Sequence, residues 1–496
     1  MIKVMCTEGN TSHEAYIIHY KRLRSTMRKM LNSALLALTM FGGAQLFAQQ
    51  PTMQYFRTYD QTGINVFETS KNEGAKYDGL KVRIGGGFTQ QFQALSHENT
   101  APESYVINGN VKHDKNMPYP ITSGFNTAAA NLMFDVQLED GIRLNLTSYL
   151  ASRHHNETWV KGGFIQIDKM KFMKSELIDD IFKYVTLKVG HQEINYGDAH
   201  FRRSDGGNTL YNPFIENYII DAFATEIGGE VYFQSNGFLA MVGMTNGEIK
   251  GNVDPIGTSR NADSTLTYSD DARSMSLLWK VGYDDKITND LRFRATASGY
   301  MKGKNGSNTL FSGDRTGSNY YLVMESAAAN FGTTPASPKP VATTQFTSGR
   351  FNPGMNDEVN AMMFNALLEG YGLEVFFNYD MNTGRSANAA DRERTFSQLA
   401  IDGIYRFSWG GKNNLFAGVR YNTVTAEAFN LAGTLSADKV DEIGIDRTAI
   451  AAGWFITPSV LLKGEYVMQN YKDFPTNNIL NGGTFNGIVV EAVVGF

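Results

Sequence analysis

The stretch Asp140-Gly-Ile-Arg-Leu-Asn-Leu-Thr147 shows the pattern that decides the fold. After Gly141 the chain alternates between apolar and polar side chains: Ile142, Arg143, Leu144, Asn145, Leu146 and Thr147. Successive side chains of a β-strand point to opposite faces, so a period of two residues gives one apolar and one polar face. The stretch therefore predicts a strand that separates water from an apolar environment.

The same alternation returns along the chain after Tyr77 and defines sixteen predicted strands. Short turns join many of them in pairs, and longer segments follow on the opposite side. This arrangement is typical of transmembrane β-barrels of bacteria, which have an even number of strands. The alternatives are 14 or 18 strands. The predicted strands cover residues 80–94, 127–138, 141–153, 157–168, 183–195, 221–234, 237–246, 273–285, 289–302, 359–370, 372–381, 395–408, 413–424, 444–456, 459–471 and 484–496.

The connections between these strands follow the same scheme. Tight turns are predicted at Glu139-Asp140, Ser235-Asn236, Asp285 to Thr288, Tyr371, Trp409 to Lys412 and Thr457-Pro458. Gly303 to Glu358 forms the longest loop, and Asn319 to Met324 within it is not counted as a strand because the total would become odd. The connection Lys169 to Phe182 has apolar residues at helical spacing, which predicts a short helix on the periplasmic side.

Two further features favour a membrane barrel over a soluble β-solenoid or sandwich. The last strand alternates and ends on Phe496, which resembles the terminal strand of many outer-membrane barrels. Aromatic residues at strand ends or outward positions predict the girdles at the two membrane interfaces: Tyr149, Trp159, Trp279, Tyr300, Tyr379, Tyr405, Trp409, Tyr421, Trp454 and Tyr466. Since every backbone amide needs a partner in hydrocarbon, a chain of amphipathic strands can cross only as a closed barrel.

The first 48 residues predict export. Arg28 and Lys29 follow Met27, an apolar stretch runs from Leu35 to Phe47, and Ala48 offers a small residue for cleavage, which is the order of a signal peptide. Residues 1–26 then form an upstream extension, and its removal with the signal changes the net charge from −5 to about −9. The predicted organisation is 1–48 removed, 49–79 a periplasmic segment, and 80–496 an outer-membrane barrel with an inward-folded loop, 196–220.

Composition excludes several other classes. The chain of 496 residues contains one cysteine, Cys6, so it builds neither a disulfide framework nor a four-cysteine zinc site. Its nearly balanced charge offers no footprint for nucleic acid. Six histidines follow residue 48, but none has a triad partner or metal spacing, and the adjacent His154 and His155 would face opposite sides of a strand. We therefore expect no enzyme activity, no metal and no cofactor, and an outer-membrane barrel hydrolase is the less favoured alternative.

The polar faces of the predicted strands are rich in cations. A barrel of about sixteen strands is too wide for side chains alone to fill, so these faces are expected to line an aqueous pore. Cations in a pore favour anions; the alternative is that they pair with Glu226, Glu230, Glu369, Glu465 and Glu491 across the wall. The predicted pore-wall residues are Lys81, Arg83, Arg143, Lys188, Lys280, Arg292, Arg294, Arg406, Arg420 and Lys463.

The loop 196–220 holds the candidate constriction. In the sixteen-strand scheme it is the third outside loop, and an inward fold would place Arg202 and Arg203 in the channel with His200 and Asp205 beside them. Aromatic residues of the loop would pin it to the wall. The alternative is an ordinary solvated surface loop.

The stretch from His191 to Tyr232, HQEINYGDAHFRRSDGGNTLYNPFIENYIIDAFATEIGGEVY, resembles Bacteroidetes-type outer-membrane porins of the phosphate-selective porin O and P family, and Tyr55 to Lys71 is similar to them too. The resemblance implies a passive outer-membrane channel, trimeric and anion-preferring. Residues 49–79 show no coiled-coil heptad, and the loop has no lysine cluster of the kind expected at a tight phosphate site.

These observations together predict a porin: a diffusion channel for small hydrophilic solutes with a preference for phosphate-like anions. Its expected partners are outer-membrane lipid, its solutes, the barrel-assembly machinery and two further copies of the chain. A non-conducting structural or secretion-associated barrel is the alternative from another class.

Overall fold

The computed structural model describes most of the chain after residue 50. The described residues are 51–72, 74–108, 110–151, 158–205, 208–249, 256–260, 266–268, 274–304, 308–326, 347–388, 390–409, 412–431 and 440–496. Two compact units are separated, Met1–Pro51 and Thr52–Phe496, and the second contains the fold described below. The predicted signal peptide and its extension, residues 1–48, lie outside the described residues.

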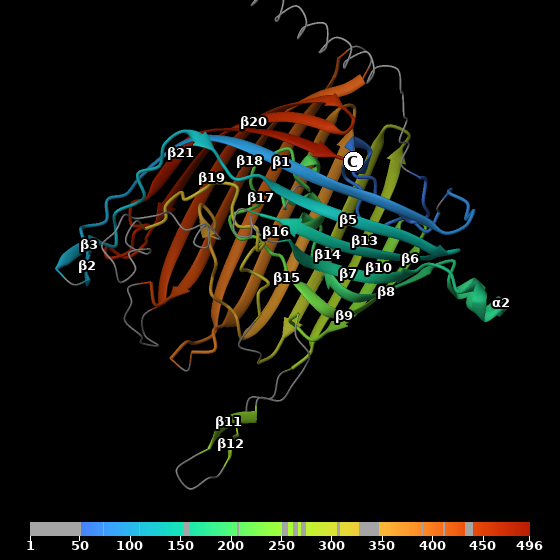
Figure 1. Ribbon diagram of the computed structural model, residues 1–496, viewed down its shortest axis with the longest axis horizontal. Helices are drawn as coiled ribbons and strands as arrows, with labels where there is room; N and C mark the ends of the chain where they lie inside the picture. Colours follow the sequence, from blue (N-terminus) through green and yellow to red (C-terminus); the bar gives the residue numbers. More distant parts are fainter. Residues whose placement is uncertain are drawn as a thin grey trace, which may run out of the picture. The chain divides into compact units, whose positions relative to one another are not determined.

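A closed antiparallel β-barrel of sixteen strands forms the second unit (Figure 1). Each strand pairs with the next along the chain, and the last strand pairs with the first, from Gly87 opposite Gly495 to Glu98 opposite Thr484, which closes the ring. The strands are β1 (Lys81–Glu98), β5 (Ala129–Glu139), β6 (Ile142–Leu150), β7 (Trp159–Ile167), β8 (Val185–Glu193), β9 (Thr225–Ser235), β10 (Phe238–Thr245), β13 (Ser276–Thr288), β14 (Leu291–Lys302), β15 (Glu358–Gly370), β16 (Leu373–Arg385), β17 (Arg394–Trp409), β18 (Lys412–Phe429), β19 (Val440–Thr457), β20 (Val460–Lys472) and β21 (Thr484–Gly495).

Smaller elements accompany the ring. The two-residue strand β4 (Gly124–Phe125) pairs with Phe92 and Gln93 of β1, next to the part of β1 that pairs with β5. Two hairpins lie outside the ring, β2 (Tyr105–Asn108) with β3 (Val111–Asp114) and β11 (Ile256–Arg260) with β12 (Leu266–Tyr268). The short helices are η1 (Gln61–Gly63), η3 (Lys171–Met173), α2 (Glu176–Ile181), η4 (Ala199–Arg202) and η5 (Asn208–Tyr211).

The predicted architecture is confirmed. All sixteen predicted strands coincide with strands of the ring, the helix predicted between Lys169 and Phe182 is α2, and Asn319 to Met324 forms no strand. Asn236 and Gly237 show why the hairpins close so tightly: their φ angles of 51° and 83° are both positive, as a two-residue turn that matches the strand twist requires. We call the end with such turns the short-turn end and the opposite end the long-loop end.

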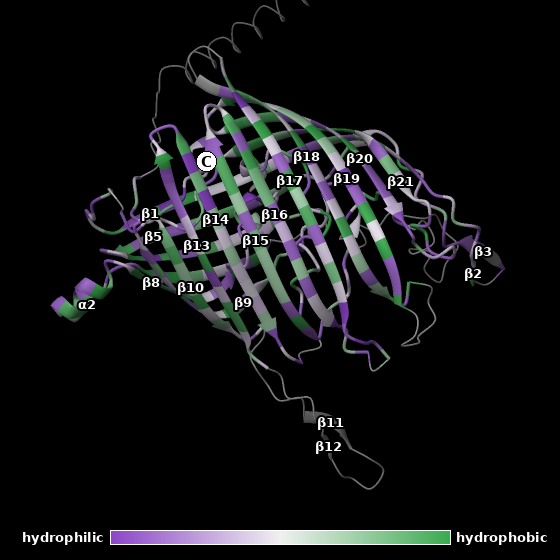
Figure 2. Cartoon of the chain, turned by 180° about the vertical axis from the view of Figure 1, so that it is seen from behind, coloured by the Kyte–Doolittle hydropathy of each residue, from purple (hydrophilic) through white to green (hydrophobic). Residues whose placement is uncertain are grey.

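Hydrophobic and hydrophilic residues alternate along the strands (Figure 2), which gives the two faces of the wall opposite character. On β21, Ile488 and Val490 are exposed on the outer face, whereas Glu491, the next residue, is fully buried inside. This distribution inverts that of a soluble protein, in which apolar side chains are buried. It is the pattern of a barrel that crosses a membrane by its strands. Among the described residues, no helix is long and apolar enough to cross a membrane.

The prediction of the aromatic girdles is wrong for two residues. Tyr149 and Tyr300 point into the barrel and are 2% and 0% exposed. The Tyr300 hydroxyl donates a hydrogen bond of 2.8 Å to Glu226, so its polar end is satisfied inside. Trp159, Tyr405 and others of the set are exposed on the outer face: Tyr421, Trp454 and Tyr466. An amphipathic aromatic side chain suits either face, which is why type alone misassigned these two.

Three segments pack inside the barrel and fill much of it. The first, residues 52–72, belongs to the predicted periplasmic segment 49–79; it reaches the wall at the short-turn end, where the Gln61 backbone N–H donates to Pro458 O at 2.8 Å. The second is the inner loop, which we define as residues 194–224. The third consists of 308–326 and 347–357 from the longest loop. Ile215 and Ile219 of the inner loop pack with Tyr320 and with Phe485 of the wall in one buried apolar cluster.

Candidate pore and constriction

Lys463 on β20 anchors the inner loop to the wall. Its ammonium group donates to the carbonyl oxygens of Thr209, Asn212 and Phe214 at 2.8–3.0 Å and lies 2.9 Å from the carboxylate of Glu491. A buried ammonium group needs such partners, because an unpaired charge inside a protein is costly. Lys463, predicted to line the pore, therefore holds the backbone of the loop.

Arg202 points from the inner loop toward β16 and β17. Its guanidinium lies 2.7 Å from Glu374 and 3.9 Å from Asp402, hydrogen-bonds to Asn65, and stacks 4.5 Å from the centre of the Phe376 ring. The side chain is 4% exposed. It thus joins the loop, the N-terminal segment and the wall on one side of the barrel.

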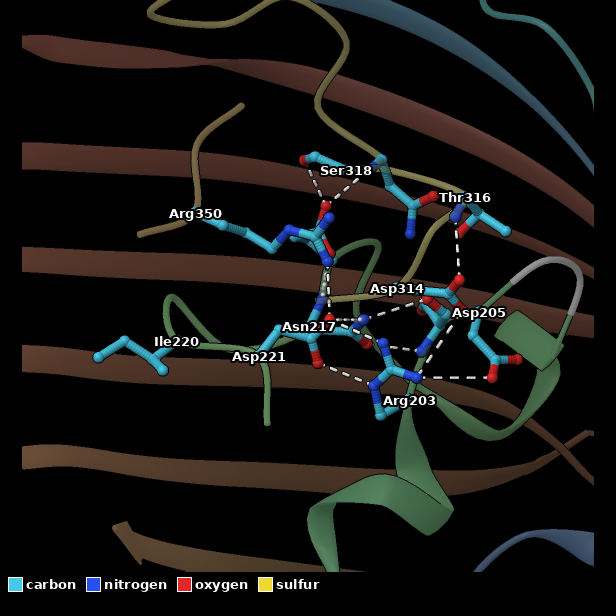
Figure 3. Close-up of polar contacts among 12 residues, drawn as sticks. Arg203, Asp205, Asn217, Ile220, Asp221, Asp314, Thr316, Ser318 and Arg350 are labelled. Carbon is cyan, nitrogen blue, oxygen red and sulfur yellow. Dashed lines mark hydrogen bonds and ion pairs between the residues drawn. The ribbon is translucent and has the colours of Figure 1, made fainter. Parts of the chain in front are cut away.

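Arg203 points the other way, into a cluster of ions shown in Figure 3. Its guanidinium donates two hydrogen bonds of 2.7 and 2.8 Å to Asp221 of the same loop. Arg350 from the third segment shares that carboxylate at 2.7 Å. Burial opposes ionisation of Asp221, but Arg203 and Arg350 lower its pKa below the ordinary value.

Lys161 completes this cluster from the opposite wall. Its ammonium group lies 2.7 Å from Asp205 and 2.8 Å from Asp314, so it links β7, the inner loop and the third segment. Lys161 is the extra residue of a β-bulge, since Thr147 pairs with Gly162 and Ser148 with Val160. A bulge re-aims the side chain of its extra residue. Three cations and three carboxylates balance in the cluster: Lys161, Arg203, Arg350, Asp205, Asp221 and Asp314.

His200 lines the same cavity as Arg203 but contacts other residues. Its ring stacks on Phe201 with 3.9 Å between centroids, its Nε2 is 2.9 Å from Asn195 Oδ1, and its Nδ1 is 3.5 Å from Glu193. Burial lowers the pKa of His200, and the nearby carboxylate of Glu193 only partly opposes this effect. The imidazole is therefore neutral at pH 7.

The four predicted constriction residues are thus divided by the fold. Arg203 and Asp205 come within 3.5 Å of each other, Arg202 binds a different part of the wall, and His200 lines a cavity with Arg203 and Asp205. Their carboxylate partners neutralise Arg202 and Arg203 closely. Neither arginine presents a free guanidinium to a wide lumen.

Most of the predicted pore-wall cations likewise contact partners inside the barrel. Lys280 and Arg294 both bind Asp198 of the inner loop at 2.7 Å and Glu68 of the N-terminal segment at 2.7–2.8 Å. The others with close carboxylates are Lys81 with Asp78, Arg292 with Asp284, Arg406 with Glu374, and Arg420 with Asp402. Arg83 stacks on the rings of Phe56 and Tyr59.

Two adjoining cavities run between the inner loop and the wall formed by β5 to β9. The long-loop cavity has a volume of about 240 Å³ and reaches Asn131, Lys161 and Asp205. The short-turn cavity has a volume of about 190 Å³ and reaches Gln166 and Gln234. Each has room for several water molecules, since one water needs roughly 10–15 Å³ measured in this way.

Six side chains line both cavities, and we call this shared part the neck. It consists of Arg57, Arg143, Phe164, Lys188, His200 and Phe201, and it contains no carboxylate. Arg143 and Lys188 were predicted pore-wall residues, and His200 was a predicted constriction residue. The neck is therefore the cation-lined place at which the two cavities adjoin.

The neck cations are neutralised less closely than Lys280, Arg294, Arg406 and Arg420. Arg143 is 4.0 Å from Asp135, and Lys188 is 3.7 Å from Glu230. Among the described residues, Arg57 has no carboxylate within 4.0 Å; its guanidinium donates to the carbonyl oxygens of Gly63 and Phe201 at 2.9 Å. Because Coulomb attraction weakens with distance, these three cations keep more of their field for a passing solute.

Several polar atoms around the long-loop cavity have no hydrogen-bond partner among the described residues. They are Asn131 Oδ1, Arg143 Nε, His191 Nε2, Gln192 Nε2 and Oε1, and Arg203 Nη1. Buried polar groups are normally hydrogen-bonded to protein or water. Such a lining suits a wet cavity or a polar solute.

Arg57 and Lys161 also line the long-loop cavity, but the sequence did not predict them as pore residues. Arg57 lies in the stretch Tyr55 to Lys71, where only the resemblance to porins drew attention. Lys161 sits at a bulge, where the period of two breaks, so alternation assigned it no face. Among the described residues, no group of three or more His, Cys, Asp and Glu side chains is arranged to hold a metal ion.

A closed sixteen-strand barrel with an apolar outer face and a polar interior belongs to the class of membrane β-barrels. One similar solved structure is the anion-selective porin from Comamonas acidovorans, with 9% identity, a TM-score of 0.47 and coverage of 84% of this chain and 100% of the porin. Another is the outer membrane channel DcaP of Acinetobacter baumannii, with 11% identity, a TM-score of 0.44 and coverage of 85% of this chain and 99% of DcaP. OmpT of Vibrio cholerae has 10% identity and a TM-score of 0.44, and the match covers 85% of this chain and 99% of OmpT. No protein-family model and no curated protein matches the sequence. The resemblance to the porin O and P family stays a prediction from the residues quoted above.

Proposed function

We propose that this protein is a passive diffusion channel of a bacterial outer membrane, through which small hydrophilic solutes cross by the passage beside the inner loop. The observation that carries the proposal is the pair of cavities joined at the neck. Since the three inner segments fill much of the barrel, solutes would pass along β5 to β9. A passage this narrow limits conduction to small solutes.

The proposed preference is for anions. The neck contributes Arg57, Arg143 and Lys188 and no carboxylate. Rows of cations in a pore lower the barrier that an anion meets on leaving water. The selectivity thus depends on neck cations rather than on the adjacent pair Arg202 and Arg203, whose charges are matched by close carboxylates. The phosphate-like solutes suggested by the sequence are one member of this class.

Cysteine modification during single-channel recording tests the passage. Since the only natural cysteine is Cys6, single cysteines are unambiguous targets in a chain without residues 1–48. Thr147→Cys lies in the long-loop cavity and Gln234→Cys in the short-turn cavity. We expect current steps in a planar bilayer, and a bulky methanethiosulfonate reagent should reduce them by at least about half at both sites, because it occupies a passage of only about 200 Å³.

Thr448→Cys on the outer alternation face of β19 is the matched control, and its current should stay unchanged. A barrel that inserts into the bilayer and gives no steps would contradict the channel and favour the non-conducting alternative. Steps that modification at Thr147→Cys and Gln234→Cys leaves unaltered would place conduction elsewhere.

A trimer is the assembly that we propose, with the low side of the barrel between subunits. β10 has 8 residues and β18 has 18. At about 3.3 Å per residue and a tilt of about 40°, these strands rise about 20 and 45 Å, against an apolar band about 25 Å tall. β10 is therefore lower than the apolar band, and contact with another copy on this side would cover it. Electrophoresis of unheated protein after crosslinking should give a band of three chains.

A further inference from the structure

Aromatic rings and cations alternate around the neck. The Phe164 ring has Arg143 at 5.4 Å and Lys188 at 4.6 Å from its centre. Across the neck, Phe201 stacks on His200 at 3.9 Å and meets Phe67 edge-on at 5.6 Å. A cation near the face of an aromatic ring is attracted to it. The Phe164 ring therefore holds two positive groups in place, and both Phe rings contribute apolar surface.

The short-turn cavity extends this arrangement. Phe67, Phe164, Phe201 and Tyr232 all line its volume of about 190 Å³. Glu68 is a carboxylate in its lining, and it lies 2.7 Å from Arg294 and 2.8 Å from Lys280. Burial opposes ionisation, but these two cations lower the pKa of Glu68 to about 2. Its charge is thus already matched, and it does little to repel an anion at the neck.

Arg143 is the cation best placed to receive an anionic group. Its Nη2 donates to Gln166 Oε1 at 2.7 Å, while its Nε has no hydrogen-bond partner among the described residues. Lys188 makes contacts of 3.5 Å or longer, to Glu193 O and to Glu230. Two under-bonded cations beside one ring can receive a carboxylate, with an apolar surface next to it.

We propose that the neck and the short-turn cavity form a binding site for small organic carboxylates with a flat apolar body, of which benzoate is a simple example. The carboxylate lies between Arg143 and Lys188, and the ring lies against Phe164 and Phe201. This inference rests on the proposed channel and names its solute class. A compact, strongly hydrated anion such as inorganic phosphate would make the charge contacts and leave the four aromatic side chains unused.

Binding is measured first, because it does not depend on conduction. Benzoate is titrated into the purified detergent-solubilised protein by calorimetry and compared with acetate, inorganic phosphate and the neutral benzamide. We expect benzoate to bind roughly tenfold more tightly than any of the three, since each lacks either the charge or the apolar body.

Four variants locate the site. Arg143→Gln and Lys188→Gln should each weaken benzoate binding about fivefold or more, and Phe164→Leu should weaken benzoate but not acetate. Arg292→Gln is the matched control, because Arg292 also lines the inner face but is paired with Asp284 at 2.8 Å, outside both cavities. It should leave benzoate binding within about twofold.

Single-channel recording separates this proposal from the channel itself. Benzoate at its binding concentration should interrupt the chloride current of the parent protein and not that of Arg143→Gln. Equal binding of benzoate and acetate, or phosphate binding that exceeds both, overturns the organic-carboxylate site even when current steps are present. Benzoate binding by a barrel that gives no current overturns the channel and leaves the site standing.

Discussion

Arg202 and Arg203 are adjacent in the chain, but their guanidinium groups bind different parts of the structure. Arg202 lies 2.7 Å from Glu374 on β16, whereas Arg203 makes two hydrogen bonds to Asp221. The backbone changes from the turn of η4 at Arg202 to an extended conformation at Arg203, which sends the two side chains apart. Arg202 therefore ties the inner loop to the wall, whereas Arg203 holds the inner loop together and, through Asp314, links it to the third segment.

Removing the charge of Arg203 should destabilise the protein. Arg203→Gln leaves Asp221 with Arg350 and removes charge from beside Asp205 and Asp314, all buried. Breaking a buried ion pair by removing one partner costs about 3–5 kcal/mol. We expect a lower temperature of the electrophoretic shift that marks barrel unfolding. Arg392→Gln is the control, because Arg392 is half exposed beside Glu427 and its pair is worth roughly 0–1 kcal/mol. Equal unfolding temperatures for the two variants would contradict the stabilising role of Arg203.

The strands were predictable because a period of two depends only on neighbouring residues. A slip by one residue would move every apolar side chain from lipid to the interior, so the alternation also settles the register. The partners of the interior charges depend instead on contacts distant in sequence. Lys463 and Thr209, for example, are 254 residues apart. A lone cation on a polar face shows neither a carboxylate across the barrel nor a loop carbonyl, so pore-lining and loop-anchoring lysines look alike in the sequence.

Charge removal at the neck should change ion selectivity. Arg57→Gln, Arg143→Gln and Lys188→Gln each remove a cation that both cavities share. We expect the reversal potential in a potassium chloride gradient to move toward cations, with the ratio of chloride to potassium permeability falling about twofold or more per charge. Arg420→Gln, beside Asp402 at 2.7 Å, is not in either cavity and should leave the ratio unchanged once the protein is folded. A shift as large in Arg420→Gln would make the effect one of overall charge.

Acidification should strengthen anion selectivity through His200. Burial lowers the pKa of His200 below its ordinary 6.5, so the ring is neutral at pH 7 and gains a proton only as the pH falls below that value. The new charge lies in the neck, near Lys280 and Glu193, and adds to Arg57, Arg143 and Lys188. Reversal potentials measured from pH 7.5 to pH 4.5 should move toward anions in the parent protein. His200→Asn keeps a polar group and should remove most of this shift; a shift of the same size in both proteins would assign it to another titrating group.

The contacts that Glu325 makes with Ser348 and Tyr119 at the long-loop end should loosen as the pH rises. Glu325 accepts a hydrogen bond of 3.0 Å from Ser348 Oγ, and its backbone carbonyl accepts another from Tyr119 N–H. Burial raises the pKa of Glu325 to about 7 from an ordinary 4.5. Between these values the folded state holds a proton that the unfolded state has released, so stability falls as the pH rises from about 4.5 to 7 and is constant above.

The size of this effect is at most about 3 kcal/mol, because one pKa unit corresponds to about 1.4 kcal/mol. Limited proteolysis around Glu325 and Ser348 at pH 5.5 and pH 8.5 should show faster cleavage at the higher pH. Glu325→Gln keeps a neutral side chain of the same size at both pH values and should be cleaved slowly at both. Cleavage that speeds up equally in Glu325→Gln would contradict the titration of Glu325, since the variant has no proton to lose.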